Sequence, residues 1–203
     1  MRLLSELQRD SLSEVFNIGA GRAASSLSEI VGEEIKLSVP CLRVLHPSEI
    51  NLEFLSLSSM RLGAVKQHFS GPFSADAMLL FTEDRTLEIV RDMMGSQISL
   101  DELADFEEEA MCELGNIILN ACLSAMADIL ELSLESSLPV YSVDSSEAIL
   151  QQIIASGNEP IILFLHINME IERRRSQGYL VFLLSSTSLD TLLEHIDRFL
   201  AVI

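Results

Sequence analysis

The chain has 203 residues, 48% of them hydrophobic, which is enough for one domain with a substantial buried core. Thirty-one acidic residues against thirteen basic residues give a formal net charge of −18. A charge of this sign repels nucleic acid and anionic lipid surfaces, so we expect neither as a partner.

Three further features exclude other classes of protein. The apolar runs at 161–165 and 179–184 are far shorter than the roughly 18 residues of a membrane span, and they predict buried strands. The first ten residues carry charges where a signal peptide is apolar, which predicts a cytoplasmic protein. The cysteines form no close pair, so neither a disulfide framework nor a zinc cluster is expected: they are Cys41, Cys112 and Cys122.

The first predicted element is a long amphipathic helix. Its apolar residues recur at helical spacing: Leu12, Val15, Phe16, Ala23, Leu27 and Ile30. A strand start marked by Pro40 follows the helix. Two β-rich runs at 62–69 and 73–82 are then joined by a Ser-Gly-Pro turn, and a short helix covers 84–94.

The same order of elements follows a predicted linker near 96–105. A second long helix has apolar residues at the same kind of spacing: Ala110, Leu114, Ile117, Ile118, Ala121 and Cys122. A strand start at Pro139, strands at 161–172 and 179–185 joined by an Arg-rich turn, and a helix at 189–200 complete this half. The segment 143–155 predicts an extra short helix, which either packs between strands or docks a partner.

The two long helices carry a repeated motif. Three residues recur at a constant offset of 99 positions: Glu14, Asn17 and Pro40 as Glu113, Asn116 and Pro139. We therefore interpret residues 1–203 as one domain made of two homologous halves, about 1–98 and 99–203. Short hairpins impose antiparallel pairing, and helices with one apolar stripe must cover a sheet face. The predicted fold is α+β: a two-layer α/β sandwich with pseudo-twofold symmetry and both motif helices on one face of an antiparallel sheet.

Residues three or four positions apart share one face of a helix. The motif therefore predicts two solvent-facing stripes: Asp10, Glu14, Asn17 and Gly21, then Glu109, Glu113, Asn116 and Asn120. Neither stripe contains a strong base, a nucleophile or a complete metal shell. An exposed carboxamide can accept a hydrogen bond from a water molecule and donate its N–H groups to a phosphoryl oxygen, which suits a substrate that is already activated.

The pattern acid-x₃-Glu-x₂-Asn-x₂₂-Pro, present twice, resembles the CheC branch of the CheC/CheX/FliY family of chemotaxis phosphatases. The resemblance covers essentially the whole chain. It implies dephosphorylation of a phosphorylated CheY-like response regulator, whose aspartyl phosphate and Mg²⁺ belong to that regulator, while this chain binds no cofactor or metal of its own.

The same resemblance implies a role for each stripe residue. Asn17 and Asn116 would each orient the attacking water, and Glu14 and Glu113 would each bind the regulator's active-site Lys. The remaining stripe residues would contact the regulator: Asp10, Gly21, Glu109 and Asn120. The leading residue of the family pattern is usually Asp or Ser, so the first stripe is the cleaner match and the second is expected to be the weaker site.

Two alternatives stay open. The chain could be a non-catalytic adaptor in the flagellar switch or a protein that binds the receptor deamidase CheD. In CheC-like proteins the extra helix of the second half is the docking element for CheD, which by position points to Asp144, Ile149 and Ile153 here. The single-site, dimeric CheX type is the other alternative, but two motifs in one chain predict a monomer.

Overall fold

A computed structural model describes residues 4–50, 60–94, 100–155, 160–171 and 174–201. Within these ranges the helices are α1 (Glu6–Val31), α3 (Glu83–Met94), α4 (Leu100–Leu130), α5 (Ser146–Ala155) and α6 (Ser186–Leu200). The strands are β1 (Ile35–Leu45), β2 (Arg61–Ser70), β3 (Ala75–Thr82), β4 (Glu135–Ser136), β5 (Val140–Ser145), β6 (Ile161–Ile171) and β7 (Arg174–Leu184).

All strands belong to one antiparallel sheet with the order β1-β6-β7-β3-β2-β4, and β5 also pairs with β2. The central pair is β3 with β7, in a register that runs from Ala75 opposite Leu184 to Leu80 opposite Tyr179. The arrangement is symmetric: exchanging β2 with β6 and β3 with β7, and β1 with the β4/β5 edge, gives the same order read from the other end of the sheet. Each half places its first strands against the hairpin of the other half, β1 on β6 and β5 on β2.

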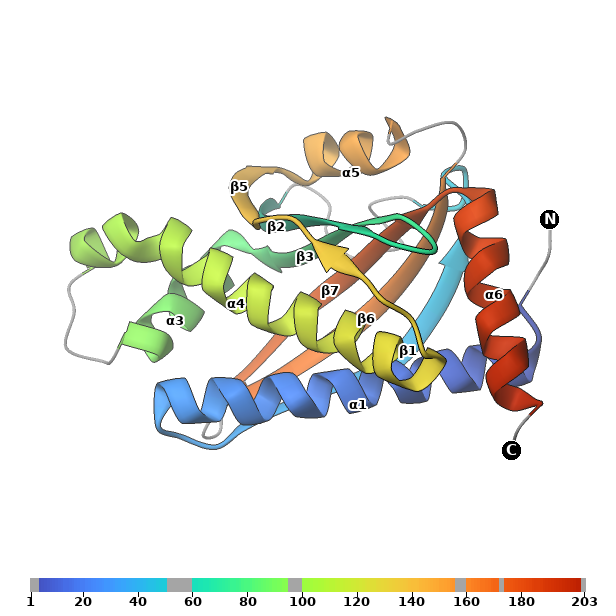
Figure 1. The fold of residues 1–203 in the computed structure, drawn as a ribbon. Helices are drawn as coiled ribbons and strands as arrows, with labels where there is room; N and C mark the ends of the chain where they lie inside the picture. Colours follow the sequence, from blue (N-terminus) through green and yellow to red (C-terminus); the bar gives the residue numbers. More distant parts are fainter. Residues whose placement is uncertain (1–3, 51–59, 95–99, 156–159, 172–173, 202–203) are drawn as a thin grey trace.

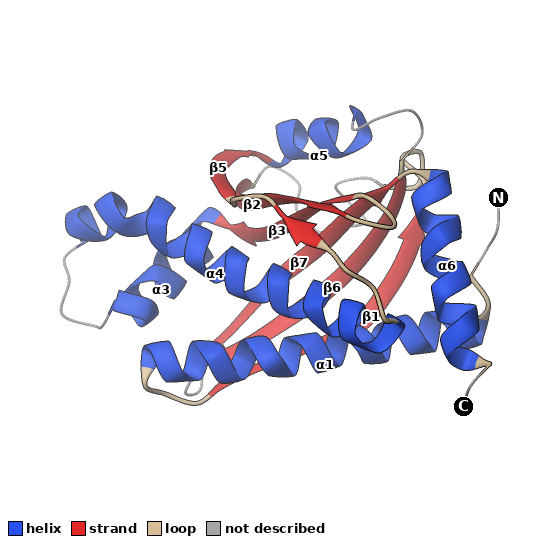
Figure 2. Ribbon diagram, viewed as in Figure 1, coloured by secondary structure: helices blue, strands red, loops and turns tan. Residues whose placement is uncertain are grey.

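The helices cover the two faces of the sheet unequally (Figures 1 and 2). The larger core lies between one face and helices α1, α3, α4 and α6, and it contains Phe16 of α1, whose ring stacks on Phe182 of β7 at 5.2 Å. A smaller core lies under α5 on the opposite face. The predicted α+β class, with both motif helices on one face of an antiparallel sheet, is confirmed, and α5 adds cover to the second face.

Helix α1 begins and ends at residues that satisfy its free backbone groups. Ser5 and Gln8 form a reciprocal capping box, and the Gln8 amide also donates to the Asp197 carboxylate of α6 at 2.6 Å. Gly32 ends the helix with a φ of 77°, a left-handed conformation that glycine adopts without strain. The bond to Asp197 also ties the first turn of α1 to α6.

Helices α1 and α4 lie side by side and cross closely at Gly19 (Figure 1). A Cβ atom at Gly19 would lie 2.5 Å from the Cα atom of Cys122, so only glycine permits this approach. Residues 105–130 of α4 are long and apolar enough to cross a membrane, but 56% of the most apolar stretch is buried inside the protein. A helix packed into a core has the same composition.

Three boundaries differ from the predicted ones. Pro40 was expected at a strand start, but β1 begins at Ile35 and Pro40 lies in its middle, where the pairing with β6 shifts register. The predicted linker at 96–105 is wrong over 100–105, which already belong to α4, while 95–99 lie outside the described residues. The Arg-rich turn predicted between 172 and 179 is wrong over 174–178, because β7 begins at Arg174 and these residues pair with β6. Both motif helices, the first hairpin and the short helix within 143–155 lie where the sequence predicts them.

Candidate functional site

The two predicted stripes lie on α1 and α4, on the same side of the sheet. Their carboxylate residues are exposed: Asp10, Glu14, Glu109 and Glu113. Within the described part of the chain, Glu14 and Glu113 form no ion pair or hydrogen bond through their side chains. Each is therefore free to bind a cation supplied by a partner. The motif asparagines are half-buried, so they differ from the fully solvent-facing position that helical spacing predicts.

Asn17 is bonded to the strand that follows its helix. Its Oδ1 accepts the backbone N–H of Val39 at 2.9 Å, and its Nδ2 donates to the Val39 carbonyl at 3.2 Å and to the Ser13 carbonyl at 3.0 Å. A side-chain amide has two donor hydrogens and an oxygen with two lone pairs. Both N–H groups of Asn17 are therefore occupied, and one lone pair of its oxygen is left.

The bond to Val39 explains the spacing of the motif. Val39 precedes Pro40 in a bulge of β1, where both residues oppose the single residue Ile167 of β6. Proline has no N–H and keeps the preceding residue extended. The bulge thus leaves the N–H and C=O of Val39 without a partner strand, and the carboxamide of Asn17 pairs with both. A gap of 22 residues before the proline brings these groups together.

Asn116 is held in a different way. Its Oδ1 accepts from Asn120 Nδ2 at 2.7 Å and from Gln67 Nε2 at 3.4 Å. Its own Nδ2 has no partner among the described residues. Leu138, which corresponds to Val39 in the repeat, is 86% exposed, whereas Val39 is 2% exposed. The second motif therefore keeps its donor N–H groups available and does not pair with the backbone before Pro139.

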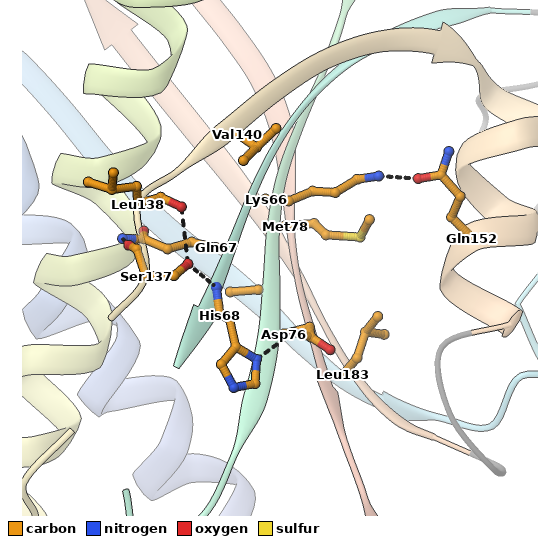
Figure 3. A pocket seen from close by; sticks show the side chains of 11 residues that line it. Lys66, Gln67, His68, Asp76, Met78, Ser137, Leu138, Val140, Gln152 and Leu183 are labelled. Atoms are coloured by element: carbon orange, nitrogen blue, oxygen red, sulfur yellow. Dashed lines mark hydrogen bonds and ion pairs between the residues drawn. The ribbon is translucent and has the colours of Figure 1, made fainter. Parts of the chain in front are cut away.

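Gln67 of β2 is a site residue that the sequence did not reveal. It is 3% exposed and also donates to the Ser137 carbonyl at 2.8 Å, next to a pocket of about 320 Å³ on this edge of the sheet (Figure 3). Its position in the strand could have indicated this role. Gln67 lies between Val65 and Phe69 in the row of β2 side chains that faces the helices, and both of these neighbours are buried. A polar residue in such a row indicates a specific buried partner.

The other predicted contact residues have different surroundings. Gly21 lies on an exposed face, with open space where a Cβ would be. Ile149 and Ile153 are each 1% exposed and anchor α5 on the sheet, so their side chains contact the smaller core and not the surface in this conformation. Apolar burial explains their spacing. Asp144 is half-buried in β5, and its carboxylate accepts the backbone N–H of Ser145 at 2.8 Å.

No group of three or more His, Cys, Asp or Glu side chains is placed to hold a metal ion within the described ranges. The chemistry that the stripes themselves offer is positional. Two exposed carboxylates can bind cationic groups, and two carboxamides can hydrogen-bond to water and to an anionic oxygen. Helices α1 and α4 are also linked by an ion pair between Arg22 and Asp128 at 2.6 Å, which is exposed and contributes little to stability.

No family model matches the chain, but its sequence and its fold are similar to those of CheC/FliY-type chemotaxis proteins. Among curated proteins, the chain is 26% identical over 152 residues to "CheY-P phosphatase CheC" of Bacillus subtilis. The aligned region covers 73% of this chain and 72% of the relative. This homology confirms the resemblance to the CheC/CheX/FliY family that the motif predicts.

Solved structures share the fold. FliY of Thermotoga maritima has a TM-score of 0.77 at 20% identity, covering 98% of this chain and 100% of that chain. CheX of Borrelia burgdorferi, solved in complex with CheY, BeF₃ and Mg²⁺, has a TM-score of 0.52 at 14% identity and covers 85% and 97%. FliM of H. pylori, solved in complex with FliG, has a TM-score of 0.62 at 16% identity and covers 94% and 100%. At these identities the likeness concerns the fold alone.

Proposed function

We propose that the chain is a phosphatase that hydrolyses the aspartyl phosphate of a CheY-like response regulator. The observation that carries this proposal is the pair of Glu-x-x-Asn units on adjacent helices, each with an exposed, unpaired glutamate one turn from a half-buried asparagine. The homology to a protein named as a CheY-P phosphatase and the fold shared with a CheX bound to CheY point to the same substrate.

In this mechanism the chain supplies position and the regulator supplies the reactive group. Glu14 or Glu113 binds the active-site Lys of the regulator, which places the helix over the phosphoryl group. Asn17 or Asn116 then orients a water molecule in line with phosphorus. The water oxygen bonds to phosphorus as the bond to the aspartyl oxygen breaks, which releases free carboxylate and inorganic phosphate. Phosphoryl transfer has a loose transition state, so positioning alone can lower its barrier substantially.

The Mg²⁺ ion in this reaction belongs to the regulator, and it neutralises charge on the phosphoryl oxygens. Because both units lie in one chain, the proposed enzyme works as a monomer. Its place of action is the cytoplasm, where a response regulator would meet it. A deamidase that docked on α5 would have to use the exposed side of that helix, for example Glu147, Gln151 and Ile154, since Ile149 and Ile153 are buried.

The test is the rate at which phosphate leaves a phosphorylated CheY-like regulator in the presence of Mg²⁺. Wild-type chain is expected to accelerate release, and the double variant Asn17→Ala/Asn116→Ala is expected to abolish the acceleration. The matched control is Ser25→Ala/Ser124→Ala, which changes two exposed serines further along the same helices and should act as wild type. A double asparagine variant as active as wild type would disprove the mechanism.

The alternative is a non-catalytic interaction protein of the chemotaxis or flagellar-switch machinery. The observation that favours it is the fold shared with FliM, which was solved in complex with FliG. The same measurement decides between the two functions. Failure of the wild-type chain to accelerate phosphate release, together with binding to the regulator, would support the adaptor role.

A further inference from the structure

Strand β2 carries one buried polar side chain on the side that faces the helices, and this side chain is Gln67. Its neighbours in the row, Val65 and Phe69, belong to the large core, and Gln67 itself is 3% exposed. A buried carboxamide is costly unless its hydrogen bonds are satisfied. The Oε1 atom of Gln67 is buried without a partner in the described part of the chain, so this residue destabilises the core compared with an apolar one.

Both donor hydrogens of Gln67 are nevertheless used. Nε2 donates to the Ser137 carbonyl at 2.8 Å and to Asn116 Oδ1 at 3.4 Å. Turning the carboxamide around would place its oxygen against these two oxygens, so only the observed orientation is favourable. In Figure 3, Gln67 extends from β2 beside Ser137 and Leu138, while Lys66 extends in the opposite direction, toward Gln152. Gln67 is thus a fixed donor aimed at the second motif.

The consequence for Asn116 is a fixed direction of its amide. Two donors, Gln67 and Asn120, occupy its oxygen, which forces its nitrogen to point away from them. The first site has no counterpart, because the β6 residues that face the helices are apolar: Leu163, Leu165, Ile167 and Met169.

We infer that Gln67 is a positioning residue of the second site: it holds the oxygen of Asn116 inward, so that the amide N–H groups face the place of an incoming anionic phosphoryl oxygen. This inference rests on the proposed function. The residue comes from the hairpin of the first half, whereas Asn116 belongs to the second half, so the second site is built from both halves. The interaction with the partner's cationic group through Glu113 does not involve Gln67.

The experiment isolates the second site with Asn17→Ala and then adds Gln67→Met. Methionine keeps the length of the side chain and removes the unpaired oxygen, so the variant is expected to fold. Initial rates of phosphate release at increasing concentrations of phosphorylated regulator give kcat and KM. We expect kcat to fall roughly tenfold and KM to change less than about twofold, because orientation is lost while docking is kept.

The matched control is Gln67→Met added to Asn116→Ala, where only the first site remains and kcat is expected to stay unchanged. An equal loss in both backgrounds would show a general structural defect and overturn the inference. If the methionine variant unfolds at a lower temperature, Gln67→Leu replaces it. The same result is then expected: a lower kcat with Asn17→Ala and an unchanged kcat with Asn116→Ala. If Asn17→Ala is active and Gln67→Met leaves kcat unchanged, the positioning role is wrong. If wild-type chain does not accelerate release at all, the proposed function fails, and the inference fails with it.

Discussion

The two motif asparagines occupy equivalent positions in the repeat but make opposite hydrogen bonds. Asn17 uses both N–H groups on the backbone of Val39 and Ser13 and keeps a lone pair free. Asn116 uses both lone pairs of its oxygen on Gln67 and Asn120, and its two N–H groups have no partner among the described residues. The motif therefore fixes where the carboxamide lies on the helix, and the neighbouring strand decides which of its atoms can meet a partner.

The difference originates in the residue before the motif proline. Val39 is buried in the bulge of β1 and offers its peptide to Asn17, whereas Leu138 is exposed and the place beside Asn116 is taken by Gln67. The two Val39 bonds fix the plane of the Asn17 amide, so its second N–H points at Ser13 and not at solvent. As held in this structure, the first asparagine braces the fold, and the second is prepared to donate to a phosphoryl oxygen.

The largest expected effect follows from this difference. Asn116→Ala should lower phosphate release by about tenfold or more, and Asn17→Ala by less than about threefold. To donate to a phosphoryl oxygen, the Asn17 amide must give up its hydrogen bond to the Val39 carbonyl. The carbonyl is then a buried acceptor without a partner, which costs about 1–3 kcal/mol. Added to the activation barrier, this cost lowers the rate of phosphate release at the first site roughly 5- to 150-fold. Single-turnover dephosphorylation of a regulator by each variant measures the two effects. Equal losses would mean that docking releases Asn17, and the comparison of the two sites would then hold only for the free protein.

The order of the two variants should reverse when stability is measured. Asn17→Ala leaves the N–H and C=O of buried Val39 unpaired, so the free energy of unfolding should fall by about 1–3 kcal/mol. Asn116→Ala should cost less than about 1 kcal/mol, because Asn120 and Gln67 each keep a second acceptor. Thermal unfolding gives the comparison, with roughly 2–4 °C expected per kcal/mol for a chain of this size. A larger loss for Asn116→Ala would contradict it.

The sequence was sufficient for most of the fold. Helical periodicity placed both motif helices, β-rich runs placed the strands of both hairpins, and helical spacing placed Glu14 and Glu113 on exposed faces. It could not show that each half pairs its first strands with the hairpin of the other half, because periodicity carries no information on which strands become neighbours. Pro40 illustrates the limit: a strand start was the ordinary expectation, and the bulge became visible only from the pairing with β6.

The ranking of the two sites could not be obtained from sequence either. Asp10 and Gly21 make the first stripe the cleaner match to the family pattern, whereas the hydrogen bonds favour the second stripe as the better donor. The decisive neighbour, Gln67, lies 49 residues from Asn116 and in the other half of the chain. No helical spacing relates the two residues. Rotating a side-chain amide by half a turn also exchanges its acceptor oxygen and its donor nitrogen, and the sequence does not specify which of the two faces a partner.

The variant with the smallest expected effect tests the cause of the difference between the two asparagines. This cause is either the peptide of Val39 or the residue one turn further along the helix, which is Gly21 in α1 and Asn120 in α4. Gly21 of α1 stands where α4 has Asn120, so Gly21→Asn gives the first site the same neighbour one turn away. The position is open, and asparagine is tolerated in a helix at least as well as glycine. Because Val39 still holds the Asn17 amide, phosphate release by Asn116→Ala/Gly21→Asn should stay within about twofold of that by Asn116→Ala alone. A rise of fivefold or more would assign the difference to Asn120 and not to the peptide of Val39.

The reciprocal variant, Asn120→Gly with Asn17→Ala, separates the two causes further, since it leaves Gln67 as the one remaining donor to the Asn116 oxygen among the described residues.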